Sequence, residues 1–351
     1  MKPTHNVMSY VALFMTLWMS FSPFVFGDTE CPTVSTIGDR RNNKNTLRLV
    51  QYNVEWLFID YYAAMDCPGN GCSWHTISDA ETHMSYVSNV LATLQPDIIN
   101  FCEIEGCDEL NMLKDQLGSS YNSYLKKGTD TSTGQNVGIL TKIDPFVSLY
   151  RSEEKIAYPI SGTKCGSTTS SGTTGVSKHY ITEFKIASMN VAMIGAHLLA
   201  IPTDPSRCVQ REGQAQVLQN IVNSYIQKGY EIILLGDMND YDAEVLDLNS
   251  DKPTSRVLDI LKGLDGQHKG TYSLTNIAIS IQQAERYSDW WDSDNNCNTS
   301  SQKDLSMIDH ILVTSNINKK ITKAYVYHGY KEYCGKWDSD HWPVVIDINT
   351  A

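Results

Sequence analysis

The segment ILLGDMNDYD, residues 233–242, ends an apolar run with Asp237, Asn239, Asp240 and Asp242. A buried strand avoids charged side chains unless the charge is paired or binds a metal. Asp and Asn are also common in turns, so a strand that leaves the core through a polar turn is the ordinary alternative. The other interpretation is a strand that delivers a carboxylate and a carboxamide to an active site at its end.

Acidic, amide or imidazole side chains lie within or beside five further apolar runs. Each one alone has an ordinary explanation, such as a strand edge, an exposed face or a buried histidine. Six segments of this kind together favour an active site, because metal-assisted phosphoryl chemistry uses these groups. The set comprises Asn53 in VQYNVEW, Glu103 in IINFCEIE, His197 after VAMIGA, Asp237 and Asn239 after IILLG, Asp309 before HILV, and Asp340 and His341 before WPVVIDI.

The spacing of Asp237 and Asn239 supports this interpretation. Residues two apart on an extended strand point to the same face. We therefore expect both side chains to address one phosphate group.

Strand-like and helix-like segments alternate from Leu47 to the end of the chain, as in a mixed α/β domain. Residues 78–95 and 210–229 have helical patterns, and Ser78 with Glu81 three residues later has the capping-box spacing. No domain boundary is visible within this region. We expect one domain over residues 46–351, preceded by a polar leader over residues 28–45.

Residues 1–27 have the features of a secretory signal peptide. Lys2 is the only formally charged residue before Asp28, and an apolar stretch separates the two. Pro23, Val25 and Gly27 stand where cleavage signals place such residues, so we expect cleavage after Gly27 and a secreted protein. The alternative is an uncleaved membrane anchor, which the length of the stretch nearly permits.

Composition limits the classes of function. The chain has 351 residues, of which 41% are hydrophobic and 19% charged, so it can build a sizeable core. Its net charge of -12 argues against a protein that holds nucleic acid by bulk charge. It does not exclude an enzyme that acts on a polyanion, because divalent cations supply positive charge locally.

The nine cysteines of a secreted chain predict disulfides and one odd thiol. Cys67 and Cys72 bracket the turn-rich stretch PGNG, which favours their pairing. Cys102 and Cys107 have the same spacing, so they are a second candidate pair.

In their order along the chain, YNVEW, QPDIINFCEIE, GAHLLA, LLGDMND, MIDHILV and SDHWPV resemble the endonuclease/exonuclease/phosphatase superfamily. That superfamily includes pancreatic-type deoxyribonuclease, abasic-site endonucleases, neutral sphingomyelinases and inositol-polyphosphate 5-phosphatases. The resemblance covers residues 46–349. It implies a four-layered αββα sandwich, an α/β (α+β) fold of two mixed sheets flanked by helices, with the active site at one end of the sheets.

The resemblance also implies which residues bind metal. Glu103 is the expected main ligand of Mg²⁺ or Mn²⁺, since carboxylates suit hard divalent cations. Asn53 is expected to support the metal or the phosphate, and Asp340 to lie near the metal. Glu55, two residues after Asn53, is expected to be a further ligand, and an exposed side chain is the alternative.

The same resemblance assigns the catalytic roles. Asp237 would orient or deprotonate the attacking water or bind a second metal, and Asn239 would donate its amide to the phosphate. His341, oriented by Asp309, would contact the phosphate or assist proton transfer. His197 would protonate the leaving oxygen or bind the phosphate.

Two assignments rest on weaker patterns. Lys178 falls where many nucleases of the family have an arginine that grips a phosphate, and a solvated lysine is the alternative. The acidic stretch from Arg286 to Asn298 would bind a structural Ca²⁺ or form a polar loop. Within it, Trp290 and Trp291 would be core residues, stack on a base or rest on a membrane surface.

We therefore expect a secreted, monomeric, divalent-metal-dependent phosphodiesterase without a stable protein partner. The preferred substrate is DNA, with RNA as an addition, cut by an endonuclease through in-line attack of water. A sphingomyelinase-type enzyme acting on phospholipids is the first alternative, and only it would involve a membrane. A non-catalytic binding module on the same fold is the alternative of another class.

Overall fold

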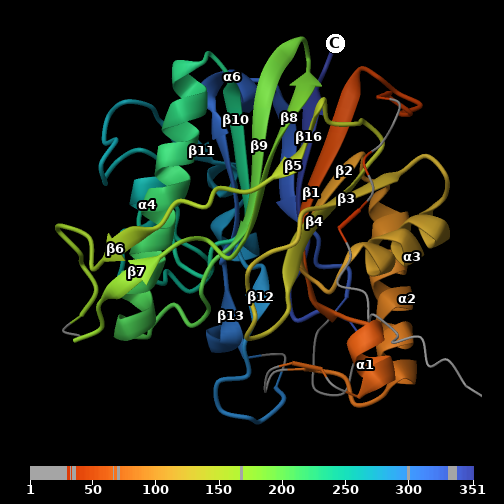
Figure 1. Cartoon of the computed structure of the whole chain (residues 1–351), viewed down its shortest axis with the longest axis horizontal. Helices are drawn as coiled ribbons and strands as arrows, with labels where there is room; N and C mark the ends of the chain where they lie inside the picture. Colours follow the sequence, from red (N-terminus) through yellow and green to blue (C-terminus); the bar gives the residue numbers. More distant parts are fainter. Residues whose placement is uncertain are drawn as a thin grey trace, which may run out of the picture.

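Two six-stranded sheets pack face to face in the computed structural model, and helices cover both outer faces (Figure 1). The structure describes residues 30–31, 33, 37–65, 67–68, 72–166, 169–298, 301–330 and 338–351. The expected signal peptide, residues 1–27, lies outside them. The αββα sandwich of two mixed sheets is confirmed.

The first sheet has the strand order β15-β16-β1-β2-β4-β3. β1 and β2 run parallel, and their neighbours pair antiparallel with them. The strands are β15 (Ile321–Val326), β16 (Val344–Asn349), β1 (Thr46–Leu57), β2 (Ile98–Ile104), β4 (Asn136–Thr141) and β3 (Asn122–Leu125).

The second sheet has the order β11-β14-β10-β9-β8-β5. β9 and β10 run parallel, and β8 and β14 flank them antiparallel. The strands are β11 (Leu274–Asn276), β14 (Asp309–Thr314), β10 (Glu231–Asp237), β9 (Met189–His197), β8 (Lys178–Ile186) and β5 (Val147–Tyr150).

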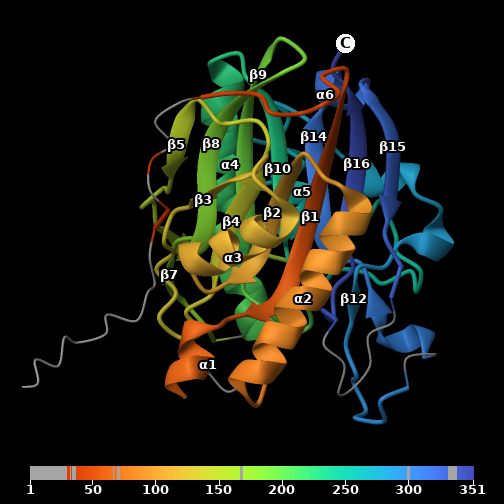
Figure 2. The same ribbon diagram turned by 90° about the vertical axis from the view of Figure 1, so that its right-hand side faces the viewer.

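Helices form the two outer layers, as Figures 1 and 2 show. α2 (Ile77–Leu94) and α3 (Cys107–Leu117) pack on the first sheet, and α4 (Pro205–Gln227) and α5 (Val257–Leu261) on the second. The shorter elements are α1 (Asp60–Ala64), α6 (Ser315–Asn318), η1 (Ile277–Ser280), η2 (Gln283–Glu285), η3 (Gln302–Asp304), β6 (Ile156–Tyr158), β7 (Gly172–Thr174), β12 (Asp289–Trp290) and β13 (Leu305–Ser306). In the described part of the chain, no helix combines the length and hydrophobicity needed to cross a bilayer.

Side-chain alternation along the strands divides the core into layers. In β1, Leu47 and Leu49 pack between the sheets, whereas Val50 and Tyr52 pack under the helices of the first sheet. Both faces of each sheet are therefore buried, which explains why the strands are almost continuously apolar. Most of the charged side chains of the candidate site therefore lie where the strands end.

Helix α2 begins earlier than the capping-box pattern suggested. Its N-cap is Thr76, not Ser78, and the Thr76 hydroxyl accepts a hydrogen bond from the Asp79 amide (3.1 Å). The threonine hydroxyl, like that of serine, can accept a hydrogen bond from a free amide of the first turn, so threonine competes for this position. α4 likewise begins at Pro205 behind an Asp204 N-cap, earlier than expected.

The disulfides correct one expected pairing. Cys67 and Cys72 are bonded as expected, but Cys107 pairs with Cys31 instead of Cys102. Cys102 is free and buried between the sheets, so its thiol cannot reach Cys107 at the start of α3. A further disulfide joins Cys165 and Cys208, and Cys297 is also disulfide-bonded.

The end of the polar leader packs against the domain. Arg40 forms an ion pair with Asp144 (2.6 Å), and Arg41 donates a hydrogen bond to the Thr46 carbonyl (2.6 Å). These contacts attach the leader beside the start of β1.

Candidate active site

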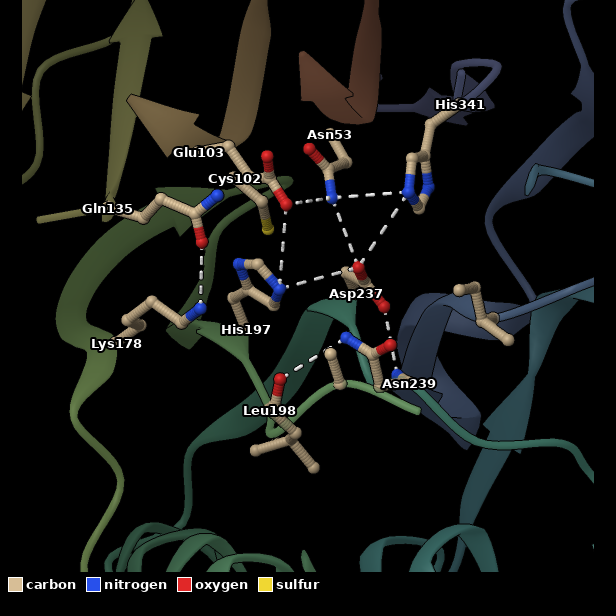
Figure 3. Close-up of polar contacts among 12 residues, drawn as sticks. Asn53, Cys102, Glu103, Gln135, Lys178, His197, Leu198, Asp237, Asn239 and His341 are labelled. Carbon is tan, nitrogen blue, oxygen red and sulfur yellow. Dashed lines mark hydrogen bonds and ion pairs between the residues drawn. The ribbon is translucent and has the colours of Figure 1, made fainter. Parts of the chain in front are cut away.

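The side chains expected to do chemistry meet at one end of the two sheets, where β1, β2, β9 and β10 end and β14 begins (Figure 3). Asn53 lies at their centre. Its amide nitrogen is 3.2 Å from the Glu103 carboxylate, 3.1 Å from that of Asp237 and 3.3 Å from Nε2 of His341. Residues from both sheets therefore share one polar cluster.

Strand register explains how the second sheet contributes. Lys178 is paired with His197, His197 with Asp237, and Asp237 with Asp309. These four residues form a row across β8, β9, β10 and β14. In β10, Ile233 and Leu235 face the other sheet, so Asp237 continues the same face at the strand end.

Glu103 reaches the site through a break in the alternation of β2. Cys102 faces the space between the sheets, and Phe101 and Ile104 face the helices. Regular alternation would therefore turn Glu103 toward the helices. Its φ of 67° and the irregular pairing after Cys102 redirect it, and its carboxylate also accepts a hydrogen bond from the Trp56 amide (3.1 Å). Positive φ is uncommon for a residue with a side chain and concentrates at functional sites.

Asn239 lies in the site for a different reason than the one expected. β10 ends at Asp237, and Asn239 has a φ of 49°, so the extended-strand argument was wrong. The backbone turns, and the Asn239 amide donates to the Asp237 carboxylate (2.9 Å). The Asn239 side chain donates to the Leu198 carbonyl (3.2 Å). Both side chains still lie in one cluster (Figure 3).

Asp309 holds the ring of His341 in one orientation. Its Oδ2 atom lies 2.7 Å from Nδ1 of His341 and also accepts a hydrogen bond from Ser288 (2.9 Å). Because Nδ1 donates to Asp309, Nε2 is the atom that faces the cluster. Burial alone would lower the pKa of His341, but the charges of Asp309, Asp340 and Asp289 outweigh it and raise the pKa well above its usual value.

The pKa values of His197 and Asp237, neighbours in the row, are shifted in opposite directions. Burial and the positive charge of Lys178 keep the pKa of His197 well below its usual value, so its ring is neutral. Its Nε2 is 3.5 Å from Asp237, and its buried Nδ1 has no hydrogen-bond partner in the described structure. Burial and the charge of Asp309 raise the pKa of Asp237 to about 8.

Lys178 is buried, which excludes the alternative of a solvated lysine. Its ammonium group donates to the Gln135 side chain (3.0 Å) and lies 3.9 Å from Asp130. It stands beside His197 at the edge of the cluster (Figure 3).

Glu55 and Asp340 are neighbours on the first-sheet side. The Asp340 amide donates to the Glu55 carboxylate (3.1 Å). Burial and the charge of Glu55 raise the pKa of Asp340 well above its usual value, with further contributions from Asp289 and Glu103.

Comparison with known proteins agrees with this geometry. Residues 50–341 match the model of the Endonuclease/Exonuclease/phosphatase family. The chain belongs to this family. It is accordingly a hydrolytic enzyme. No curated protein matches the sequence significantly.

Solved structures share the family fold at low identity. The catalytic domain of Xenopus laevis APE2 is 15% identical, with 86% of this chain and 92% of that chain covered and a TM-score of 0.54. The 3′ phosphatase NExo from Neisseria, a variant bound to a product DNA hairpin, is 15% identical over 86% of this chain and 99% of that one, with a TM-score of 0.53. A family protein from Leptotrichia buccalis is 13% identical over 86% and 99%, with a TM-score of 0.52. At these identities the likeness concerns the fold.

The residues fit the divalent cation on which enzymes of the Endonuclease/Exonuclease/phosphatase family depend. Carboxylate and amide oxygens are the ligands of hard cations. Glu103 with Asn53, and Asp340 with Glu55, supply such oxygens. Burial and the repulsion of Glu55 raise the pKa of Asp340, and a bound cation offsets both by pairing with the carboxylate. These four residues are therefore the ones that would hold the metal.

Sequence reasoning missed Asp289. Its carboxylate is 3.5 Å from Nε2 of His341 and accepts a hydrogen bond from Ser306 (2.9 Å). Burial raises its pKa to about 6. Asp289 stands in the acidic stretch RYSDWWDSD, where several aspartates look alike, so no local signal distinguishes it from its neighbours.

The stretch expected to bind Ca²⁺ is only partly suited to a cation. Carboxylate oxygens of Asp292, Asp294 and Asp304 come within 4.8 Å of one another, but Lys303 already forms an ion pair with Asp294. In the same stretch Trp290 is buried, whereas Trp291 is 71% exposed.

Proposed function

We propose that the protein is a secreted endonuclease that hydrolyses DNA, and to a lesser extent RNA, with Mg²⁺ or Mn²⁺. One observation carries the proposal: the His341–Asp309 pair and Asp237 meet the Asn53–Glu103 pair at one end of the sheets. The structure of NExo with a product DNA hairpin supports a DNA substrate on this fold.

Asp237 and His341 are positioned to handle the protons of hydrolysis. The oxygen of water forms a bond to phosphorus while its proton moves to the Asp237 carboxylate. The bond from phosphorus to the leaving sugar oxygen breaks, and Nε2 of protonated His341 gives that oxygen a proton. A divalent cation would polarise the phosphate and offset its developing charge.

The neutral and cationic groups would bind the phosphate. Asn239 has a second amide proton besides the one donated to Leu198, and this proton suits a phosphate oxygen. His197 is neutral, so it acts by contact and not as the acid. Lys178, buried beside it, supplies positive charge to the edge of the site.

Secretion is supported by the apolar segment 1–27 and by the disulfides of the mature region. Expression of the full chain in a secreting host tests it. N-terminal sequencing of the medium protein should begin at Asp28, whereas retention of the intact chain by cell membranes would contradict the proposal.

Plasmid nicking tests the activity. Purified protein lacking residues 1–27 should nick supercoiled plasmid with Mg²⁺ or Mn²⁺, lose activity in chelator and regain it when metal returns. His341→Ala and Asp237→Ala should abolish nicking without unfolding the protein. The exposed His75 lies outside the cluster, so His75→Ala is the matched control. Folded His341→Ala protein with full activity would overturn the assignment.

One observation favours a lipid phosphodiester as the second candidate. Trp291 is 71% exposed and follows β12, which bridges to His341 through Asp289. An exposed indole beside a site can stack on a base or insert at a lipid interface. Sphingomyelin vesicles should be assayed in parallel. Release of the sphingomyelin head group without nicking of the plasmid would show that the site acts on a lipid phosphodiester and not on DNA.

A further inference from the structure

A second cluster of acidic side chains lies where β1 and β2 lead into helices. Asp60 opens α1, Glu105 follows β2, and Glu109 is in the first turn of α3. One carboxylate oxygen from each comes within 4.8 Å of the other two. Three like charges this close repel one another unless something neutralises them.

Glu109 is the unusual member of this cluster. Its side chain is fully buried, and neither carboxylate oxygen has a hydrogen-bond partner in the described structure. A buried ionised carboxylate without partners is strongly unfavourable, so such a group takes up a proton, is paired or coordinates a metal. Glu109 therefore has two buried oxygens in a position to contact a cation.

The available backbone donors are used by Glu105 instead. Its carboxylate accepts hydrogen bonds from the amides of Ile59 (2.8 Å), Asp60 (3.1 Å) and Tyr61 (3.0 Å). These bonds fix one carboxylate firmly at the centre of the cluster and leave Glu109 unsatisfied. Glu105 is thus held as a rigid ligand would be held.

No positive side chain in the described part of the protein balances these charges. Within the described ranges, Asp60, Glu105 and Glu109 form no ion pair with Lys, Arg or His. The other acidic cluster differs, because Lys303 pairs with Asp294 there. Asp60 is half-buried, so it connects the buried oxygens to solvent and gives an ion a way in.

We propose that Asp60, Glu105 and Glu109 bind a structural divalent cation of the Ca²⁺ class, separate from the catalytic metal. All the ligands are carboxylate oxygens, the type that Ca²⁺ prefers. Oxygens on opposite sides of a Ca²⁺ ion are about 4.6–5.2 Å apart, so the observed separations suit one shared ion.

The ion would join the β1–α1 junction to the β2–α3 junction. Glu105 is two residues from Glu103, and the amides that it binds follow Glu55 and Trp56. Both segments beside the cluster supply candidate ligands of the active site. The cation therefore stabilises the frame of the catalytic site from outside it.

Thermal unfolding with and without calcium tests the site independently of any substrate. Millimolar Ca²⁺ should raise the Tm of the chelator-treated wild type by about 5 °C. Glu109→Gln keeps the shape and removes the charge. Its Tm in chelator should equal or exceed that of the wild type, and calcium should leave it unchanged. Asp108→Asn, an exposed neighbour on the same helix, is the matched control and should keep the full shift.

Two further variants locate the ion. Asp60→Asn, at the half-buried edge, should weaken calcium binding without adding a buried group, so it serves if Glu109→Gln fails to fold. Glu103→Gln should keep the calcium-induced rise in Tm, because Glu103 is a candidate ligand of the catalytic metal and not of this ion. A full shift in folded Glu109→Gln, or its loss in Glu103→Gln, would overturn the proposal. So would a wild type that does not respond, as expected if Glu105 and Glu109 share a proton.

Discussion

Gln51 of β1 donates a hydrogen bond to Asp309 of β14 across the space between the sheets (Nε2–Oδ1, 3.0 Å). Gln51 in turn accepts a hydrogen bond from Asn100, and Asn100 accepts one from Tyr180 (2.7 Å). A buried chain of polar side chains therefore runs from the second sheet through the first and back to the partner of His341. The members nearest Asp309 hold its carboxylate in place, and Asp309 in turn orders the imidazole of His341.

We expect Gln51→Leu to damage both stability and catalysis. The substitution leaves Asp309 Oδ1 and the Asn100 amide without their partner, at a cost of about 1–3 kcal/mol for each buried group. Urea denaturation should show the loss, and kcat should fall more than KM changes, since the ring of His341 is less well oriented. Tyr180→Phe, which removes only the far hydroxyl, is the control and should nearly keep kcat. A Gln51→Leu protein with wild-type kcat would exclude a positioning role.

Asp309→Asn should reduce kcat by about 10²–10⁴-fold, the usual contribution of a positioned acid or base. The negative charge of Asp309 raises the pKa of His341, so its removal lowers that pKa. If protonated His341 is the acid, the alkaline limb of the pH–rate profile moves to lower pH. The pH dependence of plasmid nicking by Asp309→Asn and the wild type checks this. If the alkaline limb lies at the same pH in both proteins, a group other than His341 is the acid.

Arg211 and Asp240 form a fully buried ion pair (2.9 Å). Arg211 also donates to the carbonyls of the segment after His197, including Leu199 (2.9 Å) and Pro202 (2.8 Å). Arg211→Met should destabilise the protein by about 3–5 kcal/mol, because Asp240 is left buried and unpaired. Arg211→Met with Asp240→Asn should recover part of that loss in urea denaturation. Equal stabilities of the single and double variants would show that the charge is not the cause.

The resemblance of the motifs to the superfamily predicted the sandwich, and the polar residues beside apolar runs predicted most members of the site. Asp237 and Asp309 stand at the ends of apolar strands, and alternation carries their side chains to the inner face. The placement of these two aspartates depends only on strand period and on the cost of burying charge, whereas the sandwich was implied by the resemblance.

Other features depended on backbone geometry that residue types do not reveal. Glu103 and Asn239 enter the site through positive φ angles, at positions where regular alternation fails. Gln51 is a polar residue in the middle of a strand, and its partners come from other strands. Cys31 pairs with a cysteine 76 residues away. Such long-range partners become visible only when the strand order is known.

His179 makes the stability of the fold depend on pH. Its Nδ1 donates to the Val176 carbonyl (2.7 Å), and its Nε2 accepts from the Ser152 amide (3.0 Å). This arrangement requires a neutral ring, because a second ring proton would face the Ser152 N–H. Burial and the charge of Arg151 accordingly lower the pKa of His179 to about 4.

The unfolded chain protonates this histidine near pH 6.5, and the folded protein only near pH 4. The contribution of neutral His179 to the free energy of unfolding is therefore fully present above pH 6.5. It is lost as the pH falls from about 6.5 to about 4, by about 3 kcal/mol in total. Urea denaturation across this window should show the decline, and His179→Gln should flatten it because glutamine does not titrate. His75→Gln, a change at an exposed histidine, should leave the slope of the wild type intact. The same slope in His179→Gln and the wild type would mean that other groups, chiefly the carboxylates, control acid stability.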